Sequence, residues 1–583
     1  MRRIQLADAA FLLNERRETP MHVGGISLFT LPEGVEEGPF LAELGDVLRN
    51  AAEYRKPFGE YVVTKPTGMF WELDKNIDVD YHVRHSALPK PGRYRELFAL
   101  ASRLHSVTLD RHRPLWEMHL IEGLQNRQFA MYNKMHHAAI DGIGAMHITQ
   151  GMLSTNKKSR GTDSPLSLAA YDAYKATKYG NNLHRDPPKE AELRAVSEVL
   201  KQTYDSGSNL MGALRRFSGA FFGRSGNLAV PWHNVPKTSI NTAVSGSRRF
   251  VAQSWEFERI KAVCKAMDGT VNDVVLAMCS GALRRYLDAM GELPRHSLKA
   301  MAPVSLRAEG DMESSNAIGF ITADLATNHK NPEQRLRAIQ RSMKAGKEML
   351  QGLSAREAAV FMQLTQLPAM ITSVLGLAAK YPAFSTVISN VPGPKEQLYW
   401  NGASLDGIYP ASIVFDGFAM NITLVSYNKS LDFGVVACRR SLPQIQRFID
   451  HLEESLQELE EAAGLRAVKA TKVARAKPKK APTPKTKTAT KKAIKPAKKT
   501  KAAVKAKAKP KAKPVPKAKP TPKAKAKPKP KVKSKVKPKV KPKAKAKSKP
   551  KPKAKAKAIP KATTPRPKVK RKVNAKIRPK NAS

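Results

Sequence analysis

The sequence predicts a two-lobed protein of mixed α/β class that ends in a disordered, positively charged tail. The part of the chain before the tail, about 465 residues, is too long for one typical hydrophobic core. Strand-like and helix-like patterns alternate along it, which indicates a mixed fold. The tail differs in composition, because residues 467–583 contain 48 Lys plus Arg and no Asp or Glu.

We expect four segments. Residues 1–155 and 246–465 mix strand and helix patterns and should form an N-terminal and a C-terminal lobe. Residues 156–245 are rich in polar residues, Gly and Pro, and predict an inter-lobe connector with a helix from Lys189 to Thr203. Residues 466–583 form the tail.

A strand followed by two histidines is the most informative element. Phe129 to His136 alternates in the manner of a buried strand and leads into the pattern HHxxxDG, which starts at His136 and His137. Neighbouring strand residues point to opposite faces, so the two imidazoles are not expected to enter one pocket. Asp141 stands where a helix could begin, a position that favours a carboxylate, and Gly142 permits a tight turn.

Three later segments are expected to be helical or apolar. Val271 to Leu287 predicts a buried helix, and Leu442 to Ala463 predicts an amphipathic last helix. Pro368 to Phe384 is apolar enough for membrane contact, although core packing is the simpler interpretation.

Aromatic and cationic side chains gather within about three helical turns of the connector. The group comprises Arg215, Arg216, Phe217, Phe221, Phe222 and Arg224. This combination suits a lipid headgroup boundary. An ordinary helix that packs its Phe side chains into the body is the simpler alternative.

The histidine motif has two non-catalytic interpretations. One is a pair of core histidines beside a helix cap. The other is a metal site, for which His136, His137 and Asp141 supply suitable atoms. Adjacent strand histidines diverge, and the sequence has neither HExxH nor a paired CxxC, so we expect no metal.

The HHxxxDG pattern resembles the signature of acyl-CoA-dependent acyltransferases with the chloramphenicol-acetyltransferase-like fold, a superfamily that includes the condensation domains of peptide synthetases. Further segments, in order, are similar to the bacterial wax ester synthase/diacylglycerol acyltransferase family over residues 1 to about 465. These segments are Pro20–Gly24, Pro114–Glu117, Asn272–Asp273, Pro303–Arg307 and Asn390–Pro394.

The resemblance implies an O-acyltransferase that forms triacylglycerol from diacylglycerol, wax esters from long-chain alcohols, or both. Acyl-CoA would be a substrate, and no cofactor is expected. The resemblance assigns the general base to His137, while His136 would orient the site. Neither a GxSxG elbow nor a nucleotide-binding loop occurs, so no covalent acyl-enzyme, ATP or NAD is expected.

Five other residues have supporting roles in this interpretation. Asp141 and Gly142 would shape the loop, and Arg307 is a candidate partner for Asp141. Asn272 and Asp273 match a family motif, but both residue types also cap helices well, and the two roles are weighed equally.

The sequence favours a cytoplasmic location. Its three cysteines are scattered, no apolar segment follows the basic start, and no uninterrupted run of about 18 apolar residues exists. We therefore expect a protein peripheral to the inner membrane or to lipid inclusions.

The tail predicts a polyanion partner. It has 44 Lys, 4 Arg, 19 Pro and no aromatic residue, which opposes both folding and base-specific recognition. It resembles linker-histone tails and the Ala-Lys-Pro tails of some bacterial polyester-granule proteins, which suggests DNA binding and a link to the nucleoid. Anionic lipid is the rival partner, and a merely solubilising tail is the third interpretation.

Two alternatives concern the whole protein. One is a protein that organises lipid inclusions and the nucleoid and whose catalytic body is vestigial. The other is a free-standing amide synthase of the condensation type. The intact HHxxxDG motif disfavours the first, and no carrier-protein segment accompanies the second.

Overall fold

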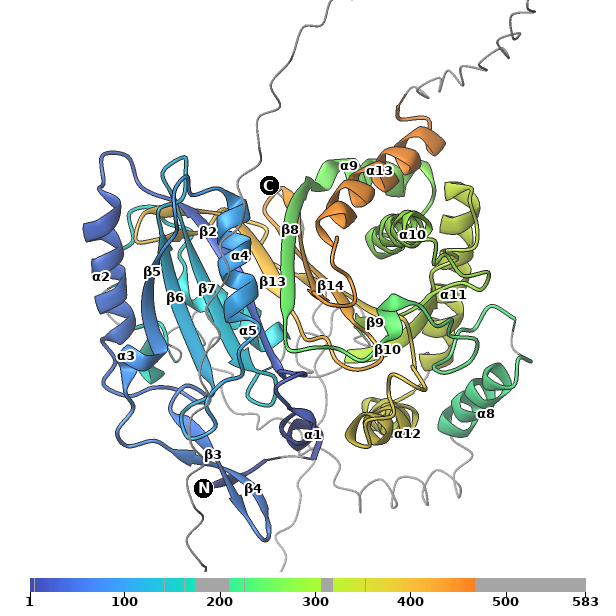
Figure 1. Ribbon diagram of the computed structural model, residues 1–583, viewed down its shortest axis with the longest axis horizontal. Coiled ribbons are helices and arrows are strands. Elements are labelled where there is room, and N and C mark those ends of the chain that lie inside the picture. Colours follow the sequence, from blue (N-terminus) through green and yellow to red (C-terminus); the bar gives the residue numbers. More distant parts are fainter. Residues whose placement is uncertain are drawn as a thin grey trace, which may run out of the picture. The chain divides into compact units, whose positions relative to one another are not determined.

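Two six-stranded sheets, each flanked by helices, form the folded body (Figure 1). The computed structural model describes residues 1–466 apart from residues 5, 141, 162–163, 171, 173–208, 225, 306–317 and 352. The tail and the expected helix from Lys189 to Thr203 lie outside these residues. Mixed α/β architecture is confirmed.

The first sheet has the order β12-β13-β2-β7-β6-β5. Its strands are β2 (His22–Thr30), β5 (Val83–Ala87), β6 (Trp116–Glu122), β7 (Gln128–His136), β12 (Tyr399–Trp400) and β13 (Ala403–Ala411). Around it lie α1 (Leu6–Asn14), α2 (Glu37–Arg49), α3 (Val79–His82), α4 (Tyr94–Leu104), α5 (Gly142–Met152) and a small sheet of β1 (Arg2–Arg3), β4 (Gly68–Leu73) and β3 (Glu60–Lys65). The strand expected from Phe129 to His136 is confirmed as β7.

The second sheet has the order β10-β9-β11-β14-β15-β8. Its strands are β8 (Arg248–Glu256), β9 (Lys299–Ser305), β10 (Ile318–Asp324), β11 (Thr386–Pro392), β14 (Met420–Tyr427) and β15 (Ser430–Cys438). Its helices are α8 (Asn209–Phe221), α9 (Phe257–Ala266), α10 (Val271–Ala289), α11 (Pro332–Leu350), α12 (Ala355–Val374) and α13 (Gln446–Ala462), and a 3₁₀ turn covers Ser239–Asn241. Helices were expected at the positions of α10 and α13, and both are confirmed.

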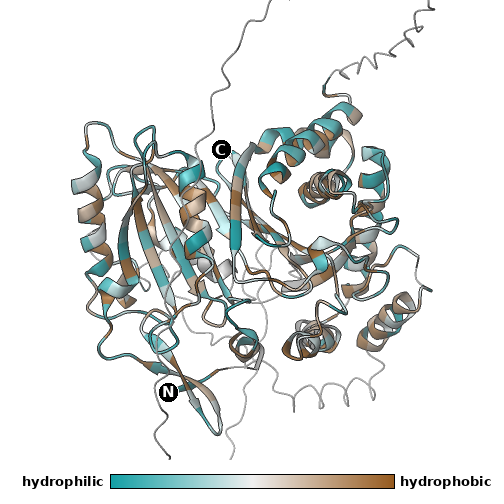
Figure 2. Ribbon diagram, viewed as in Figure 1, coloured by the Kyte–Doolittle hydropathy of each residue, from teal (hydrophilic) through white to brown (hydrophobic). Residues whose placement is uncertain are grey.

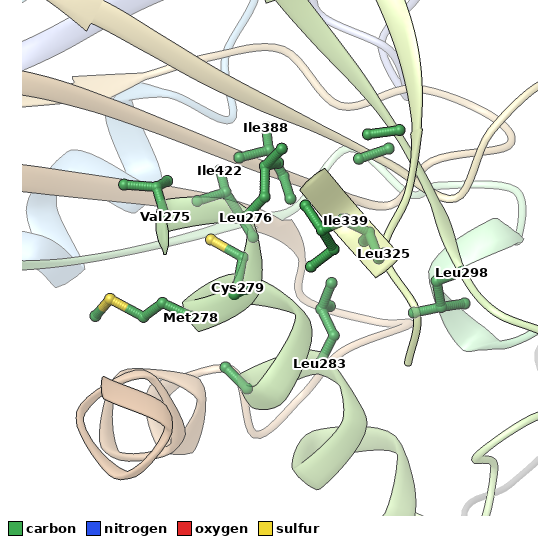
Figure 3. Packing of buried hydrophobic residues seen from close by; sticks show 14 of the residues in the cluster. Val275, Leu276, Met278, Cys279, Leu283, Leu298, Leu325, Ile339, Ile388 and Ile422 are labelled. Carbon is green, nitrogen blue, oxygen red and sulfur yellow. The ribbon is translucent and has the colours of Figure 1, made fainter. Parts of the chain in front are cut away.

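Helix α10 is the centre of the larger core. Val274 to Leu283 is continuously buried, because α11 and α13 pack beside the helix and the sheet lies against it. Figure 3 shows Leu276 of α10 beside Ile388 of β11 and Ile422 of β14. An α-helix apolar on all sides is typical of such a fully enclosed position.

The two sheets are joined by a strand exchange. β13 follows the second-lobe strand β11 in sequence but pairs antiparallel with β2 of the first sheet. β13 also packs across β15. Gly434 of β15 permits this close approach, because a Cβ at that position would overlap the carbonyl oxygen of Pro410 in β13. The histidine-bearing strand is therefore held in a sheet built from both halves of the chain.

Helix α4 covers the edge of the second sheet. The Oγ atoms of Ser102 and Ser106 accept hydrogen bonds from the N–H groups of Phe250 and Arg248, at 2.9 and 2.8 Å. These bonds satisfy backbone donors of the edge strand β8 that no neighbouring strand can pair. Among the residues that the structure describes, no helix combines the length and apolarity needed for a bilayer span.

Candidate active site

The loop that carries both histidines is fixed between two neighbouring strands. β7 ends at His136, whose N–H donates to the carbonyl oxygen of Leu115 at 3.0 Å. The N–H of His137 donates to the carbonyl oxygen of Met21 at 2.9 Å. Helix α5 then begins at Gly142. The sheet thus sets the position of both imidazoles.

His136 is sealed in the protein. Its Nδ1 accepts the N–H of Ala138 at 3.1 Å, which leaves Nε2 as the nitrogen that bears a proton. That nitrogen lies 3.5 Å from Oε1 of Glu15. Burial alone would raise the pKa of Glu15, but the contacts with His136, the N–H of Met21 and the guanidinium of Arg111 outweigh it and lower that pKa. The ring therefore lies between a hydrogen bond to Nδ1 and a buried carboxylate near Nε2.

His137 is half-buried and contacts a different neighbour. Its ring stacks on Phe11 of α1, with centroids 4.2 Å apart and planes within 5° of parallel. Stacking covers a face of the imidazole, whereas both ring nitrogens lie on its edge. Of the two histidines, His137 is the one that solvent reaches, and α1 holds its plane in place.

The buried Lys134, two residues before His136 in β7, forms an ion pair with Glu117. The ammonium has three acceptors: Oε2 of Glu117 at 3.0 Å and the carbonyl oxygens of Leu104 and Val107 at 3.2 and 3.1 Å. Burial would raise the pKa of Glu117, but His119 and Lys134 lower it to about 2. Burial lowers the pKa of the Lys134 ammonium and the contact with Glu117 opposes that shift, while all three N–H groups of the ammonium have an acceptor.

Two further histidines line the same region without carrying charge. His22, opposite His136 in the β2–β7 register, contacts the carbonyl oxygen of His105 through Nε2 at 3.0 Å. Nδ1 of His105 lies 3.0 Å from the hydroxyl of Tyr132. Burial lowers the pKa of His105 to about 3 and lowers that of His22 well below its usual value. Both rings are neutral at physiological pH.

The supporting residues expected from the sequence are only partly brought together. Asp273 forms a capping box at the start of α10: its Oδ2 accepts from Thr270 N–H at 3.0 Å and from the Thr270 hydroxyl at 2.7 Å. Helix capping therefore accounts for this carboxylate, and Asn272 lies half-buried beside it. Asp141 and Arg307 lie outside the described residues, as does their expected contact.

A cavity of about 220 Å³ connects two of the sequence motifs. Its lining is Phe257, Val271, Asn390, Pro392, Ser426 and Leu431. The start of α10, next to Asn272, thus lies beside the Asn390–Pro394 segment. Trp116, from a third motif, is buried, donates from Nε1 to the carbonyl oxygen of Phe58 at 2.9 Å and stacks on His82. Its contacts are those of a core residue.

Sequence reasoning missed two residues beside the motif, Phe11 and Glu15. No sequence pattern marks either residue. Their roles follow from the packing of α1 and the residue after it against a loop more than a hundred residues away. Within the described part of the chain, no group of three His, Cys, Asp or Glu side chains could hold a metal ion.

Comparison with known sequences gives two family matches. Residues 4–275 match the catalytic domain of wax ester synthase/diacylglycerol acyltransferases, and residues 314–460 match the C-terminal domain of the same enzymes. A Mycobacterium bovis protein named as a diacylglycerol O-acyltransferase is 42% identical over 481 residues, which cover 79% of this chain and 98% of that protein. The O-acyltransferase WSD of Acinetobacter baylyi is 39% identical over 458 residues, covering 78% and 96%.

A solved structure has the same fold. The wax ester synthase/diacylglycerol acyltransferase of Marinobacter aquaeolei VT8 is 39% identical, with a TM-score of 0.63 that covers 80% of this chain and 100% of the other. The expected two-lobed fold is confirmed. The matched length also indicates that the part of the chain before the tail corresponds to a complete protein in these relatives.

Proposed function

The chain belongs to the wax ester synthase/diacylglycerol acyltransferase family and is an acyltransferase, and we propose that it esterifies a lipid alcohol with His137 as general base. The acceptor is diacylglycerol, a long-chain alcohol or both, and acyl-CoA is the donor. No cofactor takes part in the proposed reaction. The enzyme would work in the cytoplasm at the surface of the inner membrane or of lipid inclusions, where such acceptors partition.

The reaction needs one proton acceptor beside a thioester. A neutral imidazole, with a reference pKa of about 6.5, accepts the acceptor's hydroxyl proton near neutral pH. The oxygen then attacks the thioester carbonyl, the C–S bond breaks, and the imidazolium protonates the departing thiolate of CoA. The imidazolium formed in between would lie over the Phe11 ring, where a cation–π interaction stabilises it.

The main support for His137 as the general base is the difference in burial between the two histidines. His136 is sealed and held by Glu15, so it cannot meet a substrate without a rearrangement. His137 is half-buried at the end of a fixed strand, with its ring plane set by Phe11. The same family resemblance that places the enzyme also assigns the base to the second histidine of HHxxxDG.

Release of free CoA tests the activity. Purified protein with palmitoyl-CoA should release CoA only when hexadecanol or diolein is added, with matching wax ester or triacylglycerol in the extracted lipid. Palmitoyl-CoA alone is the control for thioester hydrolysis. Absence of transfer to both acceptors would instead favour the inclusion-organising protein with a vestigial catalytic body.

For the tail we propose a second, separate function, which is non-specific binding of nucleic acid. Residues 467–583 carry 48 basic residues and no acidic ones, while the rest of the chain has 55 basic against 49 acidic residues. Each phosphate that a lysine neutralises releases counterions, so binding should weaken steeply as salt rises. A scarcity of Arg and a lack of aromatics favour contact with the backbone phosphates over contact with bases.

Deleting residues 467–583 should separate the two functions. Turnover of soluble acyl-CoA should stay within about twofold, because the deleted part lies beyond the matched family domains. Retardation of a DNA duplex in a gel at low salt should disappear. An unchanged gel shift would contradict the tail proposal. If anionic vesicles retain the full chain but DNA does not, the partner of the tail is anionic lipid instead.

A further inference from the structure

Exposed apolar side chains gather at the ends of two helices. Half of the large apolar side chains that are exposed among the described residues lie in residues 209–222 and 368–381. They are Met211, Phe221, Phe222, Ile371, Val374, Leu375, Leu377 and Tyr381. Phe222 is 69% exposed and Leu375 63% exposed. Scattered apolar residues need no explanation on a surface, but a patch of them marks an interaction site.

The two segments belong to one region of the surface. α8 lies beside α12 (Figure 1). The rings of Phe217 and Phe361 meet edge to face between them, with centroids 5.9 Å apart. Beyond α8, Gly223 lies against the ring of His233, and the N–H of Trp232 donates to the carbonyl oxygen of Ala383 at 2.8 Å. The chain after α8 thus leads directly to the segment that follows α12.

Core packing does not account for these side chains. The buried residues of α8 are Leu210, Ala213 and Ala220, which face the body. Phe221 and Phe222 follow at the end of the helix and remain exposed. Figure 2 shows brown, apolar colour along much of α12, which is far more apolar than its neighbour α11.

The charged residues of these two segments are all cationic. The sequence has no acidic residue between Asp205 and Glu256 or between Glu357 and Glu396. Exposed cations do occur there, with Arg215 and Arg224 near the two phenylalanines and Lys380 next to Tyr381. Aromatic and aliphatic side chains next to Lys and Arg are typical of surfaces that insert shallowly into an anionic lipid boundary.

We propose that the ends of α8 and α12, with the segments 222–224 and 375–381 that follow them, form the surface by which this enzyme binds anionic phospholipid. The Phe and Leu side chains enter the boundary between headgroups and acyl chains, and the Arg and Lys side chains contact lipid phosphates. We call this surface the lipid-binding face.

The lipid-binding face is connected to the proposed catalytic base. α12 packs against α1, and α1 carries the Phe11 ring that stacks on His137. A lipid layer bound at this face would place dissolved acceptor next to the elements that hold the base. This link rests on the proposed function, whereas lipid binding itself does not.

Vesicle binding tests the lipid-binding face directly. Residues 1–466 should be used beside the full chain, because the tail also attracts anionic vesicles and the shorter chain matches the whole length of the Marinobacter protein. Phosphatidylcholine vesicles with and without phosphatidylglycerol serve as probes, without acyl-CoA. The shorter chain should sediment with the anionic vesicles, and salt should weaken the binding.

Two pairs of substitutions separate the apolar contributions. F221S/F222S and V374S/L375S should each weaken vesicle binding by about tenfold, because both pairs remove side chains that enter the lipid. The matched control L73S/L465S, in which the two residues are about as exposed as those in the test pairs but lie elsewhere, should bind as the parent does. The charge pair R215E/R224E should weaken binding only to vesicles that contain phosphatidylglycerol.

Three results of the vesicle experiments would contradict the lipid-binding face. If the parent does not bind, if the test pairs bind like the parent, or if the control pair loses as much, the lipid-binding face is wrong. CoA release with a short-chain soluble alcohol should be unchanged in all variants, which shows that they are folded. Vesicle binding without any acyl transfer would leave the lipid-binding face standing and overturn the proposed function.

Discussion

Substituting His137 with alanine should lower acyl transfer by about 10²–10⁴-fold, the usual contribution of a general base. The fold should be preserved, because alanine retains the backbone hydrogen bond from this residue to Met21. The loss should be in kcat, since removing a proton acceptor changes the chemical step more than substrate binding. CoA release from palmitoyl-CoA with hexadecanol or diolein measures it.

Two other histidines supply controls for this substitution. H112A removes an exposed histidine on the same lobe and should be fully active. H136A should behave differently from H137A, because it leaves the buried carboxylate of Glu15 without its imidazole partner and should lower the stability as well as the activity. An H137A enzyme that retains activity, with the stability of the parent, would contradict the assignment of the base.

Local sequence patterns predicted those helices and strands that a short stretch of sequence can specify. Strand β7 has an alternating pattern, helix α10 an apolar one and helix α13 an amphipathic one, and each is found close to its expected range. Capping by Asp273 was one of its two expected roles, and the structure supplies the partner, Thr270, three residues earlier. The equal weighing of capping and catalysis for Asp273 came from the same local signal, which fits both roles.

Long-range placement was out of reach of the same reasoning. No local pattern in β13 indicates that it pairs with β2 almost four hundred residues earlier, and no pattern at Phe11 or Glu15 points to the histidine loop. Tertiary packing decides these contacts, because a strand or a helix face fits many partners by composition alone. The site could therefore be located by its motif, but the residues that orient it required the fold.

Substituting Lys134 with methionine should destabilise the protein by about 3–5 kcal/mol, the usual cost of removing one partner of a buried ion pair. The pKa of Glu117 should rise in the variant, because Lys134 is one of the groups that lower it, but the carboxylate keeps two partners, Arg84 at 3.4 Å and His119 at 3.5 Å. The carbonyl oxygens of Leu104 and Val107 would also lose their donor. The urea concentration at the unfolding midpoint, at constant slope, measures the loss.

A double-mutant cycle isolates the ion pair from the loss of side-chain packing. K134M/E117Q should be less destabilised than the sum of the two single variants, with a coupling of about 1–3 kcal/mol, because neither charge is then left alone. K75M, at an exposed lysine of the same lobe, should change the stability by less than about 0.5 kcal/mol. Additive single variants would show that Lys134 acts independently of Glu117, through its hydrocarbon stem and its hydrogen bonds to the carbonyl oxygens of Leu104 and Val107. In that case the strand that carries the histidine pair would owe its position to packing and hydrogen bonds, without help from the ion pair.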